Sequence, residues 1–432
     1  MPEMSVSPYW ELTFDAEGDV NASQRGRIER QAAEEGVTDL LFFSHGWNND
    51  RSIATSLYSR FFAPFPGLAG PDVRLGYVGV LWPAMRFSDE PIPDFPRSAA
   101  PPRPPAPGLD TPTQRMLGAQ FPGRTHTVAR ISELLAERPE GQPERYAEFL
   151  RLLRRLLELD PGNPTRTVAP DMADEPAQEA VPLALAEDAD AETVLAEFAT
   201  ALDEVAPDPQ HPAALWDGGR ELLRGATYYA MKRRAGTVGQ RGLGPALKRI
   251  AKAAPDARLH LIGHSFGARL ISYALRALPA TPGQVASVTL LQGAFSHYAF
   301  APKLPHDKGQ AGALNGMHRR IAGPLVSCHS KHDTALRTFY PLTARMARDD
   351  QSLLPGAERW GALGFDGIKA VTGTKNLTLK EALAADALPA KGCVSVDAAA
   401  VVKTGGAPAG AHSDICHKEL ARLVLAAGRA GR

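Results

Sequence analysis

The residues with the clearest chemical potential form the pentapeptide Gly263-His264-Ser265-Phe266-Gly267. It follows residues 258–262, a short apolar run of strand type, and precedes residues 268–278, whose apolar side chains recur with helical spacing. A sharp strand-to-helix turn of this pattern holds its serine in a strained backbone geometry with the hydroxyl exposed. Gly263 and Gly267 leave room for the tight crossing because they lack a Cβ. We therefore interpret Ser265 as a nucleophile.

A nucleophilic serine needs a base that takes its proton and an acid that orients the base. Asp333 follows residues 324–328, another strand-like run, and is the candidate acid. His412, shortly before a predicted C-terminal helix, is the candidate base. The alternative interpretation makes Asp333 a surface carboxylate paired with Lys331 or Arg337. In that interpretation His412 is a helix-start residue, with Ser413 or Asp414 as the N-cap.

These motifs resemble the α/β-hydrolase superfamily, and within it a group of poorly characterised bacterial hydrolases. The resemblance is carried by Ser44-His45-Gly46-Trp47-Asn48, by residues 262–269 and by His412-Ser413-Asp414, and it covers residues 1–85 and 215–432. It implies a mostly parallel central sheet with helices on both faces. It also implies an acyl-enzyme mechanism, because members of this superfamily carry nucleophile, acid and base in the same chain order.

The resemblance further implies where the oxyanion would bind. A His-Gly pair after an early strand, here residues 39–44, supplies the second donor in these enzymes, so the backbone N–H groups of Trp47 and Phe266 are assigned to the oxyanion hole. His45 and Gly46 are interpreted as residues that shape this loop, as His264 does in the serine turn. In two places the chain departs from the pattern. Trp47 replaces the glycine of many short-ester esterases, and Gln292 rather than an acid follows the strand-like residues 288–291.

A metal site is the main chemical alternative. His329, His332 and Asp333 lie close together in the sequence, as do His412, Asp414, Cys416 and His417, and such side chains suit zinc. Neither group has the His-Glu-x-x-His or paired Cys-x-x-Cys spacing of established zinc motifs. We therefore expect no metal and no other cofactor.

Composition agrees with an enzyme that has one large core. The chain has 432 residues, 44% of them hydrophobic, with 48 basic and 48 acidic side chains, so no net charge favours nucleic acid. Three cysteines argue against a disulfide framework, and Cys328 and Cys393 are expected to be buried thiols. No apolar run is long enough to span a membrane and no secretory signal is recognisable, so cytoplasmic location is the expectation, with signal-independent export left open.

Strands are predicted at residues 9–14, 39–44, 75–82, 258–262, 288–291, 324–328 and 393–396, and helices at 23–35, 53–62, 221–234 and 246–253. An insertion at residues 86–214 interrupts this alternation. It contains a proline-rich stretch at 91–107, predicted helices at 128–137, 144–159 and 192–205, and an acidic linker at 171–190. The apolar face of residues 144–159 is expected to pack on the core, with contact to lipid as the alternative.

The insertion would project near the ends of the strands where ligand sites form. We expect a cap or lid over the acyl pocket, with a docking platform for a protein partner as the alternative. The favoured function is a serine carboxylesterase with a small-molecule or lipid ester as substrate, and a lipase-like toxin effector as a narrower version. The alternatives are a peptidase or acyltransferase with the same triad and an interaction module on an inactive hydrolase scaffold.

Overall fold

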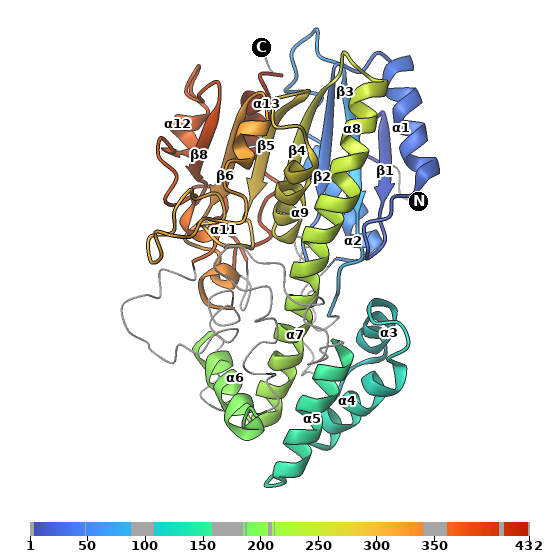
Figure 1. The fold of residues 1–432 in the computed structure, drawn as a ribbon, viewed down its shortest axis with the longest axis vertical. Helices are drawn as coiled ribbons and strands as arrows, with labels where there is room; N and C mark the ends of the chain where they lie inside the picture. Colours follow the sequence, from blue (N-terminus) through green and yellow to red (C-terminus); the bar gives the residue numbers. More distant parts are fainter. Residues whose placement is uncertain are drawn as a thin grey trace.

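A computed structural model describes residues 4–47, 49–87, 108–157, 185, 188–205, 210, 212–339, 361–405 and 410–430. These residues form one eight-stranded sheet in the order β1-β3-β2-β4-β5-β6-β8-β7, and every pair of neighbouring strands is parallel (Figure 1). The strands are β1 (Tyr9–Thr13), β2 (Asp39–Ser44), β3 (Leu75–Leu81), β4 (Arg258–His264), β5 (Val285–Leu291), β6 (Pro324–His329), β7 (Lys375–Thr378) and β8 (Gly392–Asp397). The chain is therefore an α/β protein, as expected.

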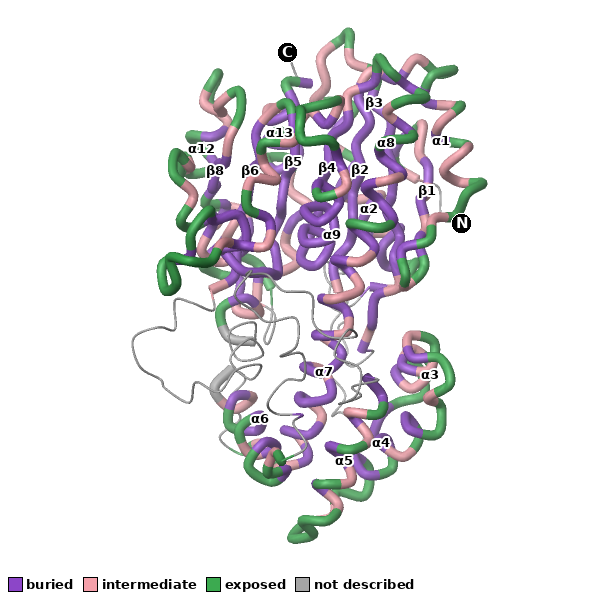
Figure 2. Tube along the Cα trace, in the orientation of Figure 1, coloured by how far each residue is buried: buried purple, intermediate pink, exposed green. Residues whose placement is uncertain are grey.

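Helices cover both faces of this sheet. The helices beside the sheet are α1 (Ala22–Glu34), α2 (Arg51–Phe62), α8 (Gly244–Ala253), α9 (Phe266–Ala274) and α13 (Lys418–Gly428). Alternate residues of β2 face opposite sides, because side chains of a strand point up and down in turn. Phe42 joins the apolar cluster that includes α1, α8 and α9, whereas Phe43 joins the cluster of α2 and α13. All six residues of β2 are buried, as a central parallel strand requires (Figure 2).

The strand order reverses direction between β2 and β4. From β2 the chain proceeds to β3 on one side, whereas β4, β5 and β6 follow on the other side. In open parallel sheets the crevice at the carboxyl ends of such a strand pair is the usual ligand site. The loop that starts with His45 and the turn that contains Ser265 both lie at this point.

The predicted helices at 221–234 and 246–253 are parts of a longer helical run. Helix α7 (Leu215–Thr237) passes through a π-helical turn, η3 (Val238–Leu243), directly into α8. A Cβ added to Gly239 would meet the carbonyl oxygen of Leu270, and one added to Gly244 would meet Ala277 Cβ at 2.6 Å. Gly239 and Gly244, which lie between the two predicted segments, therefore permit close packing of a continuous helix against α9 and the turn that follows it.

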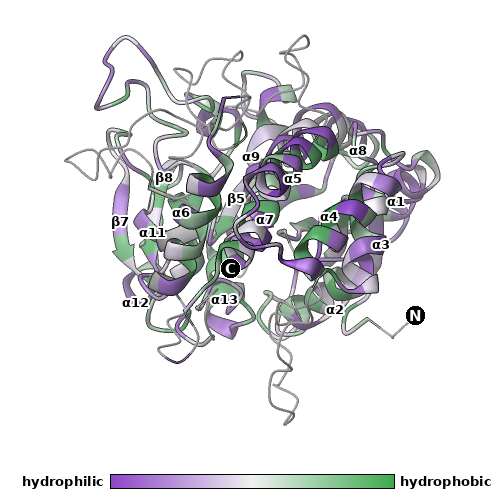
Figure 3. Ribbon diagram, turned by 90° about the horizontal axis from the view of Figure 1, so that it is seen from below, coloured by the Kyte–Doolittle hydropathy of each residue, from purple (hydrophilic) through white to green (hydrophobic). Residues whose placement is uncertain are grey.

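The insertion contributes α3 (Thr111–Gln120), α4 (Thr125–Glu137), α5 (Pro143–Leu156) and α6 (Ala191–Val205). They lie beyond the carboxyl ends of the strands in Figure 1, and Figure 3 shows both polar and apolar residues on α3, α4 and α5. Helix α3 was not predicted. The proline-rich stretch at 91–107 lies outside the described residues, as does most of the acidic linker at 171–190.

The apolar face of α5 is buried inside the molecule, as expected for a helix that packs on a core. Phe149 and Leu153 are fully buried, and the Phe149 ring lies edge-on to Trp216 of α7 with 5.5 Å between ring centroids. Most of the buried apolar residues described in the insertion belong to the same cluster as one face of the sheet. The described part of the insertion therefore shares a core with the rest of the chain through α7.

A buried polar network lies at the amino ends of the central strands. His260 of β4 contacts Asp39 Oδ1 through Nε2 at 2.7 Å and Ser287 Oγ through Nδ1 at 2.9 Å. Arg258 adds an ion pair to Asp39 at 2.7 Å, and all three members of the Ser287-His260-Asp39 chain are at most 1% exposed. The end of α13 closes over it, because a Cβ on Gly428 would collide with the His260 ring. This network holds β2, β4 and β5 together and is inaccessible to a substrate.

Candidate active site

Ser265 occupies the turn between β4 and α9 in a conformation that is rare for a residue with a side chain. Its φ is 56° and its ψ is −120°. The neighbouring strand fixes this geometry, since the Ser265 N–H donates to the Leu291 carbonyl at 3.0 Å and the Ser265 carbonyl accepts from Ala294 N–H at 3.3 Å. Backbone strain of this kind persists only where the surroundings over-determine it, and it clusters at functional sites.

The glycines around Ser265 are required by close approach of backbone segments. A Cβ on Gly263 would lie 2.5 Å from Ala268 Cα, and one on Gly267 would lie 2.5 Å from the carbonyl oxygen of His45. Gly46 is equally constrained, because its Cβ would lie 2.6 Å from Ser265 Cβ. This packing agrees with the sequence interpretation of Gly263 and Gly267. The structure adds that Gly46 packs against the serine itself.

The structure brings Ser265, His412 and Asp333 together. His412 Nε2 lies 2.8 Å from Ser265 Oγ, and His412 Nδ1 lies 2.8 Å from Asp333 Oδ2. Because a carboxylate only accepts, Nδ1 carries the proton and Nε2 is free to accept the serine proton. Two alternative interpretations are wrong: Asp333 is 0% exposed rather than on the surface, and α13 begins at Lys418, well after His412.

The expectation of an exposed serine hydroxyl needs a correction. Ser265 is only 4% exposed, since the Gly46 loop packs on its Cβ and His412 covers its Oγ. The His412 side chain retains 15% exposure. Among the described residues, solvent therefore reaches the triad mainly beside the base rather than at the nucleophile.

Three donors hold the Asp333 carboxylate. Oδ2 accepts from His412 and from Gln292 Nε2 at 3.2 Å, and Oδ1 accepts from the backbone N–H of Leu336 at 3.0 Å. Gln292 was noted from the sequence only because no acid stands there. Its position directly after a strand was the available signal, because strand ends of a parallel sheet converge on one edge.

His412 is held through its backbone as well as its ring. The Nε2–H of His264 donates to the His412 carbonyl at 2.8 Å, which joins the base to the residue before the nucleophile. Burial, and secondarily the neighbouring His412, lower the pKa of His264 to about 3, so His264 is neutral at working pH. Asp414 fixes the same loop, since its Oδ2 accepts from the N–H groups of Lys403 at 3.0 Å and Thr404 at 2.8 Å.

The two residues assigned to the oxyanion hole flank the serine. Phe266 is the first residue of α9, so its N–H has no acceptor within the helix and the helix dipole adds partial positive charge there. Trp47 lies in the loop after β2, which Asn49 shapes by donating from Nδ2 to the Trp47 carbonyl at 2.9 Å. Tyr228 of α7 joins both residues, with ring centroids 4.5 Å from Phe266 and 5.9 Å from Trp47.

His45 is a fixed part of the loop rather than a second base. Its Nδ1 lies 2.9 Å from the Gly46 carbonyl, and its ring stacks on Trp82 with 5.5 Å between centroids. Burial lowers the pKa of His45 to about 4. The hydrogen-bond partner of Ser265 Oγ is His412, and His45 shapes the loop as the sequence suggested.

No group of three His, Cys, Asp or Glu side chains that could hold a metal ion occurs among the residues that the structure describes. The three cysteines are free thiols, and burial raises the pKa of Cys328 and of Cys393 to about 12. Both were predicted to be buried, and both are. No helix within the described ranges is long and apolar enough to cross a membrane.

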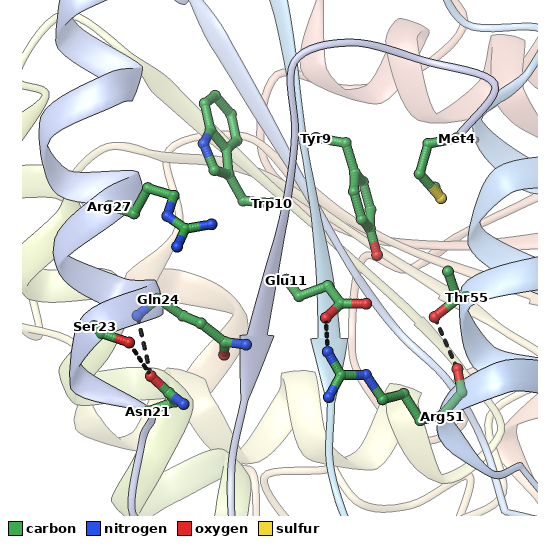
Figure 4. Close-up of a pocket in the computed structure, with 10 residues that line it drawn as sticks. All are labelled: Met4, Tyr9, Trp10, Glu11, Asn21, Ser23, Gln24, Arg27, Arg51 and Thr55. Carbon is green, nitrogen blue, oxygen red and sulfur yellow. Dashed lines mark hydrogen bonds and ion pairs between the residues drawn. The ribbon is translucent and has the colours of Figure 1, made fainter. Parts of the chain in front are cut away.

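A hollow of about 420 Å³ lies away from this site, along the free edge of β1 (Figure 4). Two pairs of its polar side chains contact one another: Glu11 pairs with Arg51, and Asn21 Oδ1 accepts from Ser23 Oγ at 2.8 Å. It is lined by neither a member of the triad nor an oxyanion donor. The hollow is therefore separate from the cluster around Ser265.

This arrangement can deprotonate a hydroxyl, because His412 Nε2 accepts from Ser265 Oγ while Asp333 holds the other side of the imidazole. The start of α9 beside Ser265 can stabilise an anion. Comparison with known protein families, with curated proteins and with solved structures finds no match to this chain.

Proposed function

We propose that this chain is a serine hydrolase of the α/β-hydrolase superfamily that cleaves carboxylic esters. The observation that carries the proposal is the hydrogen-bonded series from Ser265 Oγ through His412 to the buried Asp333. The parallel sheet, the strained serine after β4 and the reversal of strand order between β2 and β4 support it.

The geometry supports a two-step mechanism. His412 Nε2 takes the hydroxyl proton as Ser265 Oγ attacks the ester carbonyl, and Asp333 stabilises the resulting imidazolium. The N–H groups of Trp47 and Phe266 bind the tetrahedral oxyanion. The imidazolium then gives its proton to the departing alcohol, which leaves an acyl group on Ser265. Water, deprotonated by His412, releases the acid and restores the enzyme.

Covalent labelling tests the nucleophile directly. A fluorophosphonate probe should label the protein at Ser265, and Ser265→Ala should abolish both labelling and ester cleavage. The substitution removes one hydrogen bond to His412, so the free energy of unfolding should change by about 1 kcal/mol or less. Undiminished ester turnover by the folded Ser265→Ala protein would refute the proposal.

The insertion would act as a cap that selects acyl chains. Helices α3–α6 lie beyond the carboxyl ends of the strands, and Tyr228 of the helix that carries them contacts Trp47 and Phe266 (Figure 1). Replacing residues 86–214 by a short linker removes Tyr146 and Phe149, which pack on the buried Trp216 ring, so the variant should also carry Trp216→Gln. It should still cleave small esters but lose preference among longer acyl chains. Retained chain-length preference would instead favour a docking platform.

A further inference from the structure

Gln292 contacts the acid of the triad at the same oxygen atom as the base. Its Nε2 lies 3.2 Å from Asp333 Oδ2, the same oxygen that accepts from His412 Nδ1 at 2.8 Å. We propose that Gln292 is a positioning residue that holds Asp333 in the orientation that His412 requires. This inference rests on the proposed function, because it concerns the same site.

The orientation of the Gln292 amide follows from its neighbours. Its nitrogen also donates to the Gly364 carbonyl at 3.1 Å, so both groups within reach on that side are acceptors. The reverse orientation would place Oε1 against a carboxylate and a carbonyl oxygen, which is repulsive. Oε1 is buried and has no hydrogen-bond partner among the described residues. The side chain thus leaves its acceptor unpaired in order to present both N–H groups to oxygen atoms, which is uncommon in a protein interior.

The backbone of Gln292 is also strained. Its φ is 47°, a value that residues other than glycine rarely adopt, and the residue is 0% exposed. The Gln292 N–H donates to the Cys328 carbonyl at 3.2 Å, and Gly364 packs so tightly on Gln292 that a Cβ there would lie 2.5 Å from its Cα. Ser265 and Gln292 therefore end adjacent strands, β4 and β5, in left-handed conformations that aim their side chains at one catalytic cluster.

Two donors on one carboxylate oxygen fix the plane of the carboxylate. The Leu336 N–H restrains Oδ1 at 3.0 Å, whereas Oδ2 is shared between the imidazole and the amide. Without the amide, Asp333 can rotate about its side-chain bonds and the negative charge is left with one donor fewer. A hydrogen bond to a buried charged group is worth enough that its loss should slow the reaction about tenfold or more.

The test uses the full-length protein and the rate at which a fluorophosphonate labels Ser265, measured from pH 5 to pH 9. Gln292→Met keeps the volume and removes the donor, so labelling should slow about tenfold at every pH. In Gln292→Glu a protonated carboxyl replaces the amide donor to Asp333, so labelling at pH 5 should stay near the wild-type rate. The carboxyl groups of Asp333 and of the new glutamate lie close enough to share one proton. Loss of that proton at higher pH should make the two groups repel each other and slow labelling about tenfold.

A double-substitution comparison separates positioning from general structural support. In an Asp333→Asn background, Gln292→Met should change the labelling rate less than about twofold, because the group that it positions is altered. Gln284 provides the matched control. Its amide donates to the carbonyls of Ala254 at 2.9 Å and Ala257 at 3.0 Å at the other end of the sheet. Gln284→Glu and Gln284→Met should leave the pH dependence of labelling unchanged.

The outcomes are separable. Failure of the wild-type protein to be labelled would refute the proposed function. If the wild type is labelled normally and Gln292→Glu keeps the wild-type pH profile of labelling, only the role of Gln292 is refuted. The same holds if Gln284→Glu changes the pH profile in the same way as Gln292→Glu. If Gln292→Met does not fold, Gln292→Glu at pH 5 still decides, because it restores the donor. A Gln292→Glu protein that is unfolded at pH 5 would assign Gln292 to folding and overturn the inference.

Discussion

Gly46→Ala is the perturbation that tests most directly whether the loop after β2 belongs to the catalytic machinery. The new Cβ would lie 2.6 Å from Ser265 Cβ, 3.1 Å from the His264 carbonyl oxygen and 3.2 Å from His264 Nδ1. Carbon atoms prefer separations of about 3.5 to 4.0 Å, so the loop or the serine must move by about 1 Å. All three neighbours are short of free space, because His264 and Ser265 are at most 4% exposed.

This displacement should affect activity more than stability. A shift of about 1 Å in a catalytic group can slow a reaction about 100-fold, and the Trp47 N–H would move with the loop. Overpacking a buried site destabilises a protein by about 1 to 3 kcal/mol, which leaves a folded protein at room temperature. The assay is the rate of fluorophosphonate labelling of Ser265, with thermal unfolding measured on the same sample.

Gly118→Ala makes the same chemical change where nothing is near. Apart from its chain neighbours and the backbone of its own helix, α3, no atom of the described residues lies within 4 Å of a Cβ on Gly118. Labelling should match the wild type, and the melting temperature should stay or rise, since alanine favours a helix over glycine by about 1 kcal/mol. Wild-type labelling in Gly46→Ala would show that the loop after β2 does not pack against Ser265 and has no part in catalysis.

The roles of His264 and of Asp39 can each be tested by substitution. His264→Gln should keep the labelling rate within about threefold of wild type, because its amide can still donate to the His412 carbonyl. His264→Phe cannot donate and should slow labelling about tenfold, which corresponds to the loss of one hydrogen bond. Equal rates for the two variants would contradict this role of His264. Burial opposes the charge of Asp39, but hydrogen bonds from His260 and Thr38 and the charges of His260 and Arg258 outweigh it and lower the pKa of Asp39. The resulting stabilisation should be present above about pH 3.9, the unfolded value, and be lost as pH falls through the lower folded value. Asp39→Asn should therefore lower the free energy of unfolding, measured in urea, by about 1.5 to 3 kcal/mol at neutral pH. The variant's free energy of unfolding should also depend less on pH between about pH 3 and pH 5. An unchanged pH dependence would exclude this source of stability.

The core of the candidate site could be predicted because its signals are local. A strand, a glycine-bounded serine and a helix adjoin in the sequence, and the acid and base follow in a recognisable order. The resemblance to the α/β-hydrolase superfamily implied a mostly parallel sheet, and all neighbouring strands of the sheet are parallel. Strand β7, Lys375–Thr378, escaped notice because it is a short polar segment, and its pairing with β8 defines it as a strand.

Features that depend on contacts between distant residues were not predictable. The Gln292 contact with Asp333 joins two loops that only the folded sheet brings together. The glycines at 239, 242 and 244 interrupt the local helical pattern, yet they serve packing of a continuous helix against α9 and Phe14. The Ser287-His260-Asp39 network is equally invisible in the sequence, although its residue types match those of the triad.

The strand order has a consequence for how the chain reaches its native state. Strands β2 and β4 are neighbours at the centre of the sheet, yet β3 ends at Leu81 and β4 begins only at Arg258. During synthesis from the amino terminus, β1, β2 and β3 emerge long before β4 does. The edge of β2 that pairs with β4 in the native sheet has no partner strand during that interval. Both faces of β2 are apolar, with Leu40 and Phe42 on one face and Leu41 and Phe43 on the other. Unpaired apolar edges associate readily with other chains, so the yield of refolding should fall as protein concentration rises.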